Sequence, residues 1–102
     1  MISLNEDTVA SVMAQVAQNV KARRLEMNLT QEGLASRAGV KLPTYRKFER
    51  TGRISFEGLL QVAFALGALA EVRNLFTSKH YESIADVLDE TKAAGRKRGT
   101  KK

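Results

Sequence analysis

The 102-residue sequence contains no cysteine and no tryptophan, and it has a single proline and a single histidine. Without cysteine the chain has neither a disulfide framework nor a thiolate zinc site. No apolar run approaches the roughly 20 residues that a membrane-spanning helix needs. The first residues also lack the basic region of a signal peptide. We therefore expect a bacterial-type cytoplasmic protein with no membrane partner.

Residues that would carry catalysis are equally scarce. His80, the only histidine, stands beside Tyr81 and Glu82 and fits a surface position better than a ligand or a general base. The sequence shows no pairing of a nucleophile with a base, no glycine-rich loop suited to a phosphate and no metal-ligand spacing. We therefore expect no enzymatic activity, no cofactor and no metal site.

The length corresponds to one domain, and the lack of strand-like alternation predicts an all-α fold. A first helix is predicted over residues 7–27, because apolar residues recur there at three- and four-residue spacing. Its N-terminus would be capped by Ser3 with Glu6, or by Asp7 alone. The apolar stripe of this helix consists of Val9, Val12, Met13, Val16 and Val20.

Residues 30–51 predict two short helices joined by a tight turn, and the rest of the chain is organised around them. Thr30 is a good N-cap for the first helix. Gly39 can adopt a left-handed backbone, which ends that helix. Pro43 fits the first turn of the second helix, where a missing N–H costs little. The residues expected to face inward are Leu34, Ala35, Tyr45 and Phe48.

Two more helices are predicted after this pair, over residues 56–66 and 69–76. Ser55 would cap the first of them and Gly67 would end it. Residues 83–90 suggest a short extra helix, whose apolar side either closes the core of the protomer or touches a partner. That apolar side consists of Ile84, Val87 and Leu88.

Positive charge is concentrated in two segments. Residues 37–53 carry six basic side chains and one acidic one, and residues 92–102 carry six basic side chains and no acid. Residues 1–91 are therefore expected to form the domain and residues 92–102 a basic flexible tail. Lys21, Arg23 and Arg24 would offset the dipole at the end of the first helix, and one of the two arginines is a candidate to reach a phosphate as well. Such a distribution favours a nucleic-acid partner.

The two central helices resemble the helix-turn-helix of the phage-repressor and Cro type, the XRE family. The resemblance implies a five-helix domain whose second motif helix enters the DNA major groove. The matching residues are Gln31, Leu34, Ala35, Gly39, Val40, Phe48 and Glu49.

By this resemblance the protein would bind a palindromic double-stranded DNA operator as a homodimer. Lys41, Leu42, Pro43, Arg46 and Lys47 are expected to face base edges. The residues expected to hold phosphates are Gln31, Thr44 and Arg50.

A second resemblance is narrower. The segment over residues 48–55, the Leu-Leu helix after it and the basic tail are similar to HipB-like antitoxins, which are small repressors encoded beside HipA-type kinases. This resemblance implies an antitoxin that neutralises a HipA-like serine/threonine kinase toxin and represses its own operon. Two alternatives are a stand-alone phage-type transcriptional regulator and, in a different class, a protein-interaction module that binds its partner without DNA.

Overall fold

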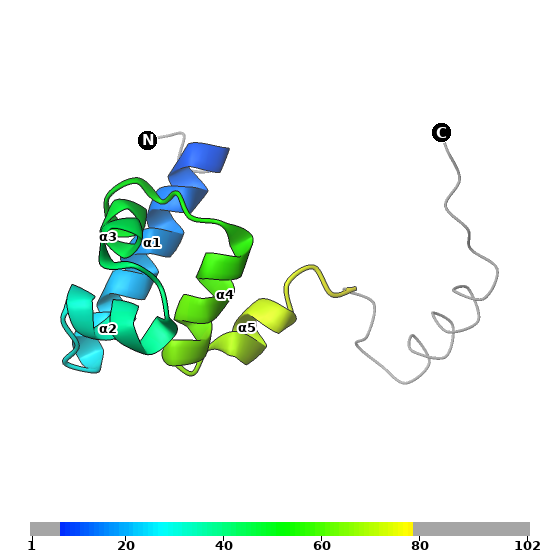
Figure 1. The fold of residues 1–102 in the computed structure, drawn as a ribbon. Coiled ribbons are helices and arrows are strands. Elements are labelled where there is room, and N and C mark those ends of the chain that lie inside the picture. The colour runs from blue at the N-terminus through cyan, green and yellow to red at the C-terminus, as the bar shows by residue number, and fades with distance from the viewer. Residues whose placement is uncertain (1–6, 79–102) are drawn as a thin grey trace.

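The computed structural model describes residues 7–78, and within them it contains five helices and no strand. The prediction of an all-α fold is therefore confirmed. In Figure 1, α1 lies beside α3, and α4 connects the motif helices to α5. The helices are α1 (Val9–Glu26), α2 (Gln31–Ala38), α3 (Leu42–Thr51), α4 (Phe56–Ala65) and α5 (Leu69–Arg73).

The start of α1 differs from the prediction. Its N-cap is Thr8, whose hydroxyl accepts a hydrogen bond from the Ser11 N–H at 3.0 Å, while the Thr8 N–H donates to the Ser11 hydroxyl. The caps predicted at Ser3 or Asp7 were wrong. The capping box is formed by Thr8 and Ser11, with serine in the place where a glutamate is usual. Val9 and Val12 are exposed. The apolar spacing identified a helix, but it did not show that only the later turns are covered by other helices.

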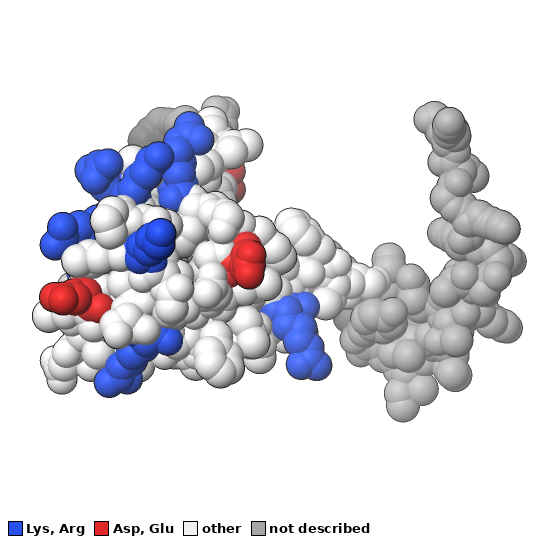
Figure 2. All heavy atoms as spheres, in the orientation of Figure 1, with Lys and Arg blue, Asp and Glu red and all other residues white. Residues whose placement is uncertain are grey.

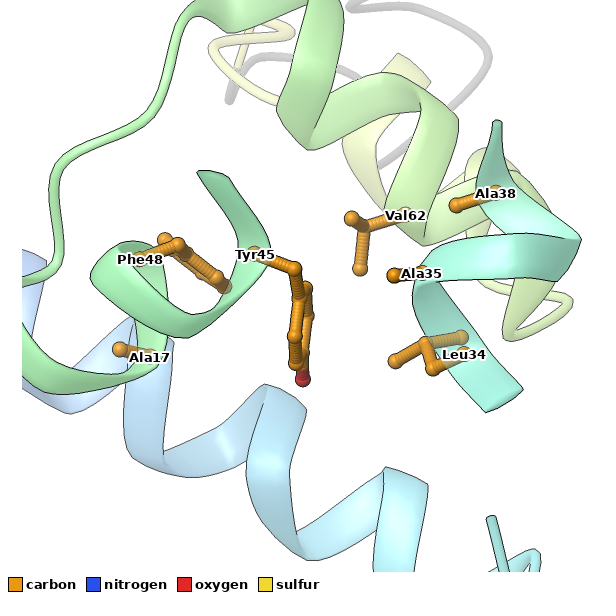
Figure 3. Packing of buried hydrophobic residues seen from close by; sticks show 7 residues of the cluster. All are labelled: Ala17, Leu34, Ala35, Ala38, Tyr45, Phe48 and Val62. Carbon is orange, nitrogen blue, oxygen red and sulfur yellow. The ribbon is translucent and has the colours of Figure 1, made fainter. Parts of the chain in front are cut away.

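The core is made where α1, α2, α3 and α4 meet. In the view of Figure 3, Tyr45 of α3 lies between Phe48, which is near Ala17 of α1, and the apolar face of α2, and Val62 of α4 lies between Tyr45 and Ala35. The two aromatic rings are tilted, with their centroids 6.0 Å apart. The buried cluster comprises Ala17, Leu34, Ala35, Ala38, Tyr45, Phe48 and Val62.

Gly52 joins α3 to the following link at a very close helix crossing. Its φ of 81° is left-handed, and a Cβ atom placed there would lie 2.8 Å from the carbonyl oxygen of Met13. The chain can therefore leave α3 against the backbone of α1 only if this position has no side chain. Nothing in the local sequence around Gly52 indicates this contact with α1.

The last two helices follow the prediction less closely. Ser55 caps α4, and Gly67 turns the chain with a φ of 75°. However, α5 ends at Arg73, three residues before the predicted end, and the Phe76 side chain is 99% exposed. The expected helix over residues 83–90, His80 and the basic tail lie outside the described residues.

Candidate nucleic-acid interface

The turn between α2 and α3 has the predicted geometry. Thr30 caps α2 by accepting a hydrogen bond from the Gly33 N–H at 2.9 Å. Gly39 has a φ of 73°, and the N–H of Val40 then donates to the carbonyl oxygen of Ala35 at 3.0 Å. This closes the end of α2 and sends the chain directly into α3. The buried methyl group of Ala35 lets the helices approach closely.

Helix α3 starts at the predicted place. Lys41 is its N-cap without a side-chain cap, and Pro43 occupies the first turn. Tyr45 and Phe48 are almost completely buried, so this side of α3 is fixed against the core. The opposite side of α3 is exposed to solvent. The short turn fixes the orientation of α3 relative to α2.

A buried polar network connects the inward side of α3 to α1 and α2. The Arg24 guanidinium donates to both carboxylate oxygens of Glu49, at 2.8 Å through Nε and 3.2 Å through Nη2. Gln31 Nε2 and the Tyr45 hydroxyl also donate to this carboxylate. Arg24 Nη1 donates to the carbonyl oxygen of Leu29 at 2.8 Å. One carboxylate thus links α1, the start of α2 and α3.

The network corrects the sequence interpretation of Arg24. Its side chain is only 8% exposed and pairs with a carboxylate that is 6% exposed, so it does not reach a DNA phosphate. Arg23 donates to Glu71 of α5 at 2.9 Å on the surface. The available signal was Glu49 itself, the single acid in a basic stretch, four residues after the inward-facing Tyr45.

Burial and hydrogen bonding both shift the pKa values of Glu49 and Tyr45. Burial raises the pKa of Glu49, but the hydrogen bonds from Arg24, Tyr45 and Gln31 together lower it by more, so its pKa lies below its ordinary value. Burial, followed by the hydrogen bond to Glu49, raises the pKa of the Tyr45 hydroxyl above its ordinary value. At neutral pH the site therefore contains a carboxylate and a neutral phenol, with Arg24 positively charged.

The solvent side of α3 and its N-cap carries only basic charge, because Glu49, the one acid of this helix, is buried. Figure 2 shows Lys and Arg side chains gathered over the region where Figure 1 places α3. The exposed basic side chains from this helix and its N-cap are Lys41, Arg46, Lys47 and Arg50.

The remaining predicted contact residues have different environments. Pro43 and Thr44 are exposed, whereas Leu42 is half-buried and packs against the core. Gln31 is also half-buried, and one of its amide N–H groups donates to Glu49. A phosphate contact from Gln31 would therefore use its second N–H or the N-terminus of α2.

Helix α1 adds side chains that the sequence analysis did not assign to the interface. Gln18 and Lys21 of α1 line a depression together with Arg46 and Arg50 of α3. Lys21 is exposed and widens the basic surface beyond α3. Nothing in the local sequence pattern places residue 21 beside residue 46, because their proximity depends on how α1 crosses α3.

Two further findings concern other kinds of site. Within residues 7–78, His, Cys, Asp and Glu side chains do not gather in groups of three that would hold a metal ion. None of the helices in the same residues is both long and apolar enough to cross a membrane.

Comparison with known proteins gives one family match. Residues 20–69, from the second half of α1 to the first residue of α5, match a family model described as helix-turn-helix. No curated protein matches the chain. The match agrees with the five-helix arrangement, which is that of a phage-repressor-like domain, and it supports a DNA-binding transcription regulator.

Proposed function

With residues 20–69 matching a helix-turn-helix model, we propose that the protein is a sequence-specific transcriptional repressor whose α3 enters the major groove of its operator. The observation that carries the proposal is the division of charge on α3. Its acid is buried beneath the helix and its basic side chains face outward. Basic side chains on this face could contact the backbone phosphates and the O6 and N7 acceptors of guanine in the major groove.

The exposed residues of α3 fall into two proposed groups, those that contact bases and those that contact phosphates. Lys41, Arg46 and Lys47 suit guanine O6 and N7 atoms, and Pro43 with the exposed part of Leu42 suits apolar contact with thymine methyl groups. Phosphate contacts are proposed for Arg50 in the last turn of α3, for Thr44 in its first turn and for Gln31, the first residue of α2.

Substitution on α3 separates these roles. Arg46→Ala or Lys47→Ala is expected to weaken binding to the operator by about 1–3 kcal/mol and to change binding to random DNA little. Arg50→Ala is the matched control, and it should weaken both complexes by similar amounts. Fluorescence anisotropy on operator and scrambled duplexes at one salt concentration provides the measurement. Equal losses on both duplexes for Arg46 and Lys47 would make them phosphate contacts.

The repressor is proposed to act as a two-fold homodimer. One recognition helix contacts only a few base pairs. Two helices placed one DNA turn apart double the number of base pairs that the protein contacts. Exposed apolar side chains toward the end of the described residues are candidates for the contact, among them Leu69 and Phe76. We expect light scattering of the operator complex to give two protomers per site. One protomer per complete site would contradict the dimer.

A HipA-type serine/threonine kinase is proposed as the protein partner, which would make this chain an antitoxin. The support is the HipB-like sequence over residues 48–55 and the placement of α5 away from α3, which leaves a surface for a second protein on bound DNA. Co-expression with the neighbouring gene product should give a copurifying pair and restored growth. A neighbour of another type, or a kinase that does not bind, favours the stand-alone regulator.

A further inference from the structure

An open, largely apolar groove lies between α1 and the segment from α4 to Leu75. Helix α1 packs chiefly on α3, whereas α4 packs on α2 and α5, and the groove runs where α1 faces α4 and α5. Its polar lining includes the ion pair between Arg23 and Glu71. Its larger apolar residues come from these helices and from the residues that follow α4 and α5: Val16, Val20, Leu59, Leu66, Val72 and Leu75.

This groove has a volume of about 450 Å³ and is open to solvent, so it is a surface feature and not an enclosed cavity. Val16 and Leu59 pack with one side against the core cluster and line the groove with the other. The core therefore continues to the groove surface without a cover from residues 7–78, and covering it would remove apolar area from water.

The described chain ends three residues after its last contact with this groove. Leu75 lines it, and Ser78, the last described residue, follows three positions later. The next apolar stripe in the sequence is Ile84, Val87 and Leu88, whose spacing puts all three on one side of a helix. Five residues lie between Ser78 and Ile84, and the six Cα–Cα steps that join them can span up to about 20 Å. The stripe is thus tethered within reach of an uncovered apolar surface.

We propose that residues 83–90 dock in this groove as a sixth helix of the same protomer, with Ile84, Val87 and Leu88 against α1, α4 and α5. The same chain is favoured over a second copy because a short tether gives an effective concentration in the millimolar range. The groove is lined by α1 as well as by α4 and α5, so the docked segment adds apolar contacts between α1 and α5, which the Arg23–Glu71 ion pair already joins at the surface.

The proposal also divides the apolar surface between two uses. Val72 and Leu88 become part of the protomer's own core. Leu69 and Phe76, which do not line the groove, stay available for a second copy. Docking is independent of DNA binding, so it stands even if the protein does not read an operator.

Because the chain has no cysteine, engineered disulfides test the docking directly. Ala22 is exposed and lines the groove on α1, the wall opposite the point where the chain leaves α5. Ala22→Cys is combined in the full-length chain with Ile84→Cys, Val87→Cys or Leu88→Cys in turn. We expect at least one pair to oxidise almost completely at the mass of the monomer, since a disulfide requires Cα atoms about 4.4–6.8 Å apart.

Ala14→Cys serves as the matched control, because it is exposed on α1 outside the groove and about 12 Å along the helix. Its pairs with the same three positions should stay reduced. Failure of all three Ala22→Cys pairs to oxidise would overturn the proposal. Cross-links found only at the mass of a dimer would also overturn it and would assign the groove to a second copy.

Thermal unfolding gives an independent readout of the same docking. The double substitution Ile84→Asp with Leu88→Asp is expected to lower the melting temperature by about 5–10 °C, because the stripe would leave the groove. Asp86→Asn with Asp89→Asn changes charge in the same segment on its polar side and should leave the melting temperature within about 2 °C. An unchanged melting temperature in the apolar variant would overturn the proposal.

Discussion

Arg24→Ala is expected to destabilise the domain by about 3–5 kcal/mol, because it leaves the buried Glu49 carboxylate without its cation. The carbonyl oxygen of Leu29 would also lose its donor. The carboxylate links three helices, so its release should loosen α3 as well as lower stability. Urea unfolding at pH 7 measures the loss, and binding to the operator should fall in parallel.

Arg23→Ala is the matched control. Arg23 is the neighbouring arginine on α1, and its ion pair with Glu71 is similarly short, at 2.9 Å against 2.8 Å for Arg24 and Glu49. Both side chains of the Arg23 pair are substantially exposed, at 43% and 64%. Exposed pairs contribute roughly 0–1 kcal/mol. Equal losses for the two variants would contradict the role assigned to the buried network.

The effect of Arg24→Ala has a distinctive pH dependence. In the natural protein the pKa of Glu49 lies below its ordinary value, so the stability contributed by the ionised carboxylate is fully present above that ordinary value and is lost as the pH falls through the folded pKa. In the variant, burial without Arg24 would raise this pKa, and stability would then be lost as pH rises. We therefore expect the stabilities of the two proteins to differ most at neutral pH and least in acid, where Glu49 is protonated in both.

Gly52→Ala is expected to cost about 2–5 kcal/mol. The alanine would have to keep a φ of 81°, which is strained for any residue with a side chain, and its Cβ would lie 2.8 Å from backbone atoms of Met13. The new Cβ is fixed to the backbone of residue 52 and would meet backbone atoms of Met13. The clash can therefore be relieved only if α1 moves relative to α3. Urea unfolding should show the loss directly.

Gly67→Ala separates the strain from the contact. Gly67 has nearly the same φ, 75°, but a Cβ there would meet no atom within 4 Å. Its substitution should therefore cost only the backbone strain, about 1–2 kcal/mol. The difference between the two alanine variants gives the cost of the contact between Gly52 and α1, and a difference of zero would show that this contact is not limiting.

The sequence predicted the helix-turn-helix well because its signals are local. A cap at Thr30, a left-handed glycine at position 39 and an inward pair at Tyr45 and Phe48 each act within a few residues, and all agree on one geometry. The family match over residues 20–69 agrees with them. The exposure of the basic side chains followed from the same helical spacing.

The features that sequence reasoning missed depend on contacts between distant residues. Arg24 and Glu49 are 25 positions apart, and an arginine near a helix end looks like a surface residue until its partner is known. Val9 and Val12 fit an apolar stripe, but which turns of α1 become covered depends on the other helices. The proximity of Lys21 to Arg46 has the same origin.

The buried carboxylate also clarifies the charge of the interface. Counted along the sequence, Glu49 appears to reduce the positive charge of α3. In the fold it is neutralised by Arg24 from α1, so none of its charge is directed to the solvent side of α3. The outer surface is therefore more basic than the sequence count indicates, and the network that fixes α3 is the one that keeps this surface free of acid.

The most direct measurement is the affinity of the full-length protein for duplex DNA from the region upstream of its own gene, compared with a scrambled duplex of the same composition. Fluorescence anisotropy at a fixed, near-physiological salt concentration suits it. If α3 reads bases from a dimer, the upstream duplex should bind at least about 10³-fold more tightly than the scrambled one. Equal affinities for the two duplexes, or no binding to either, would contradict a sequence-specific repressor.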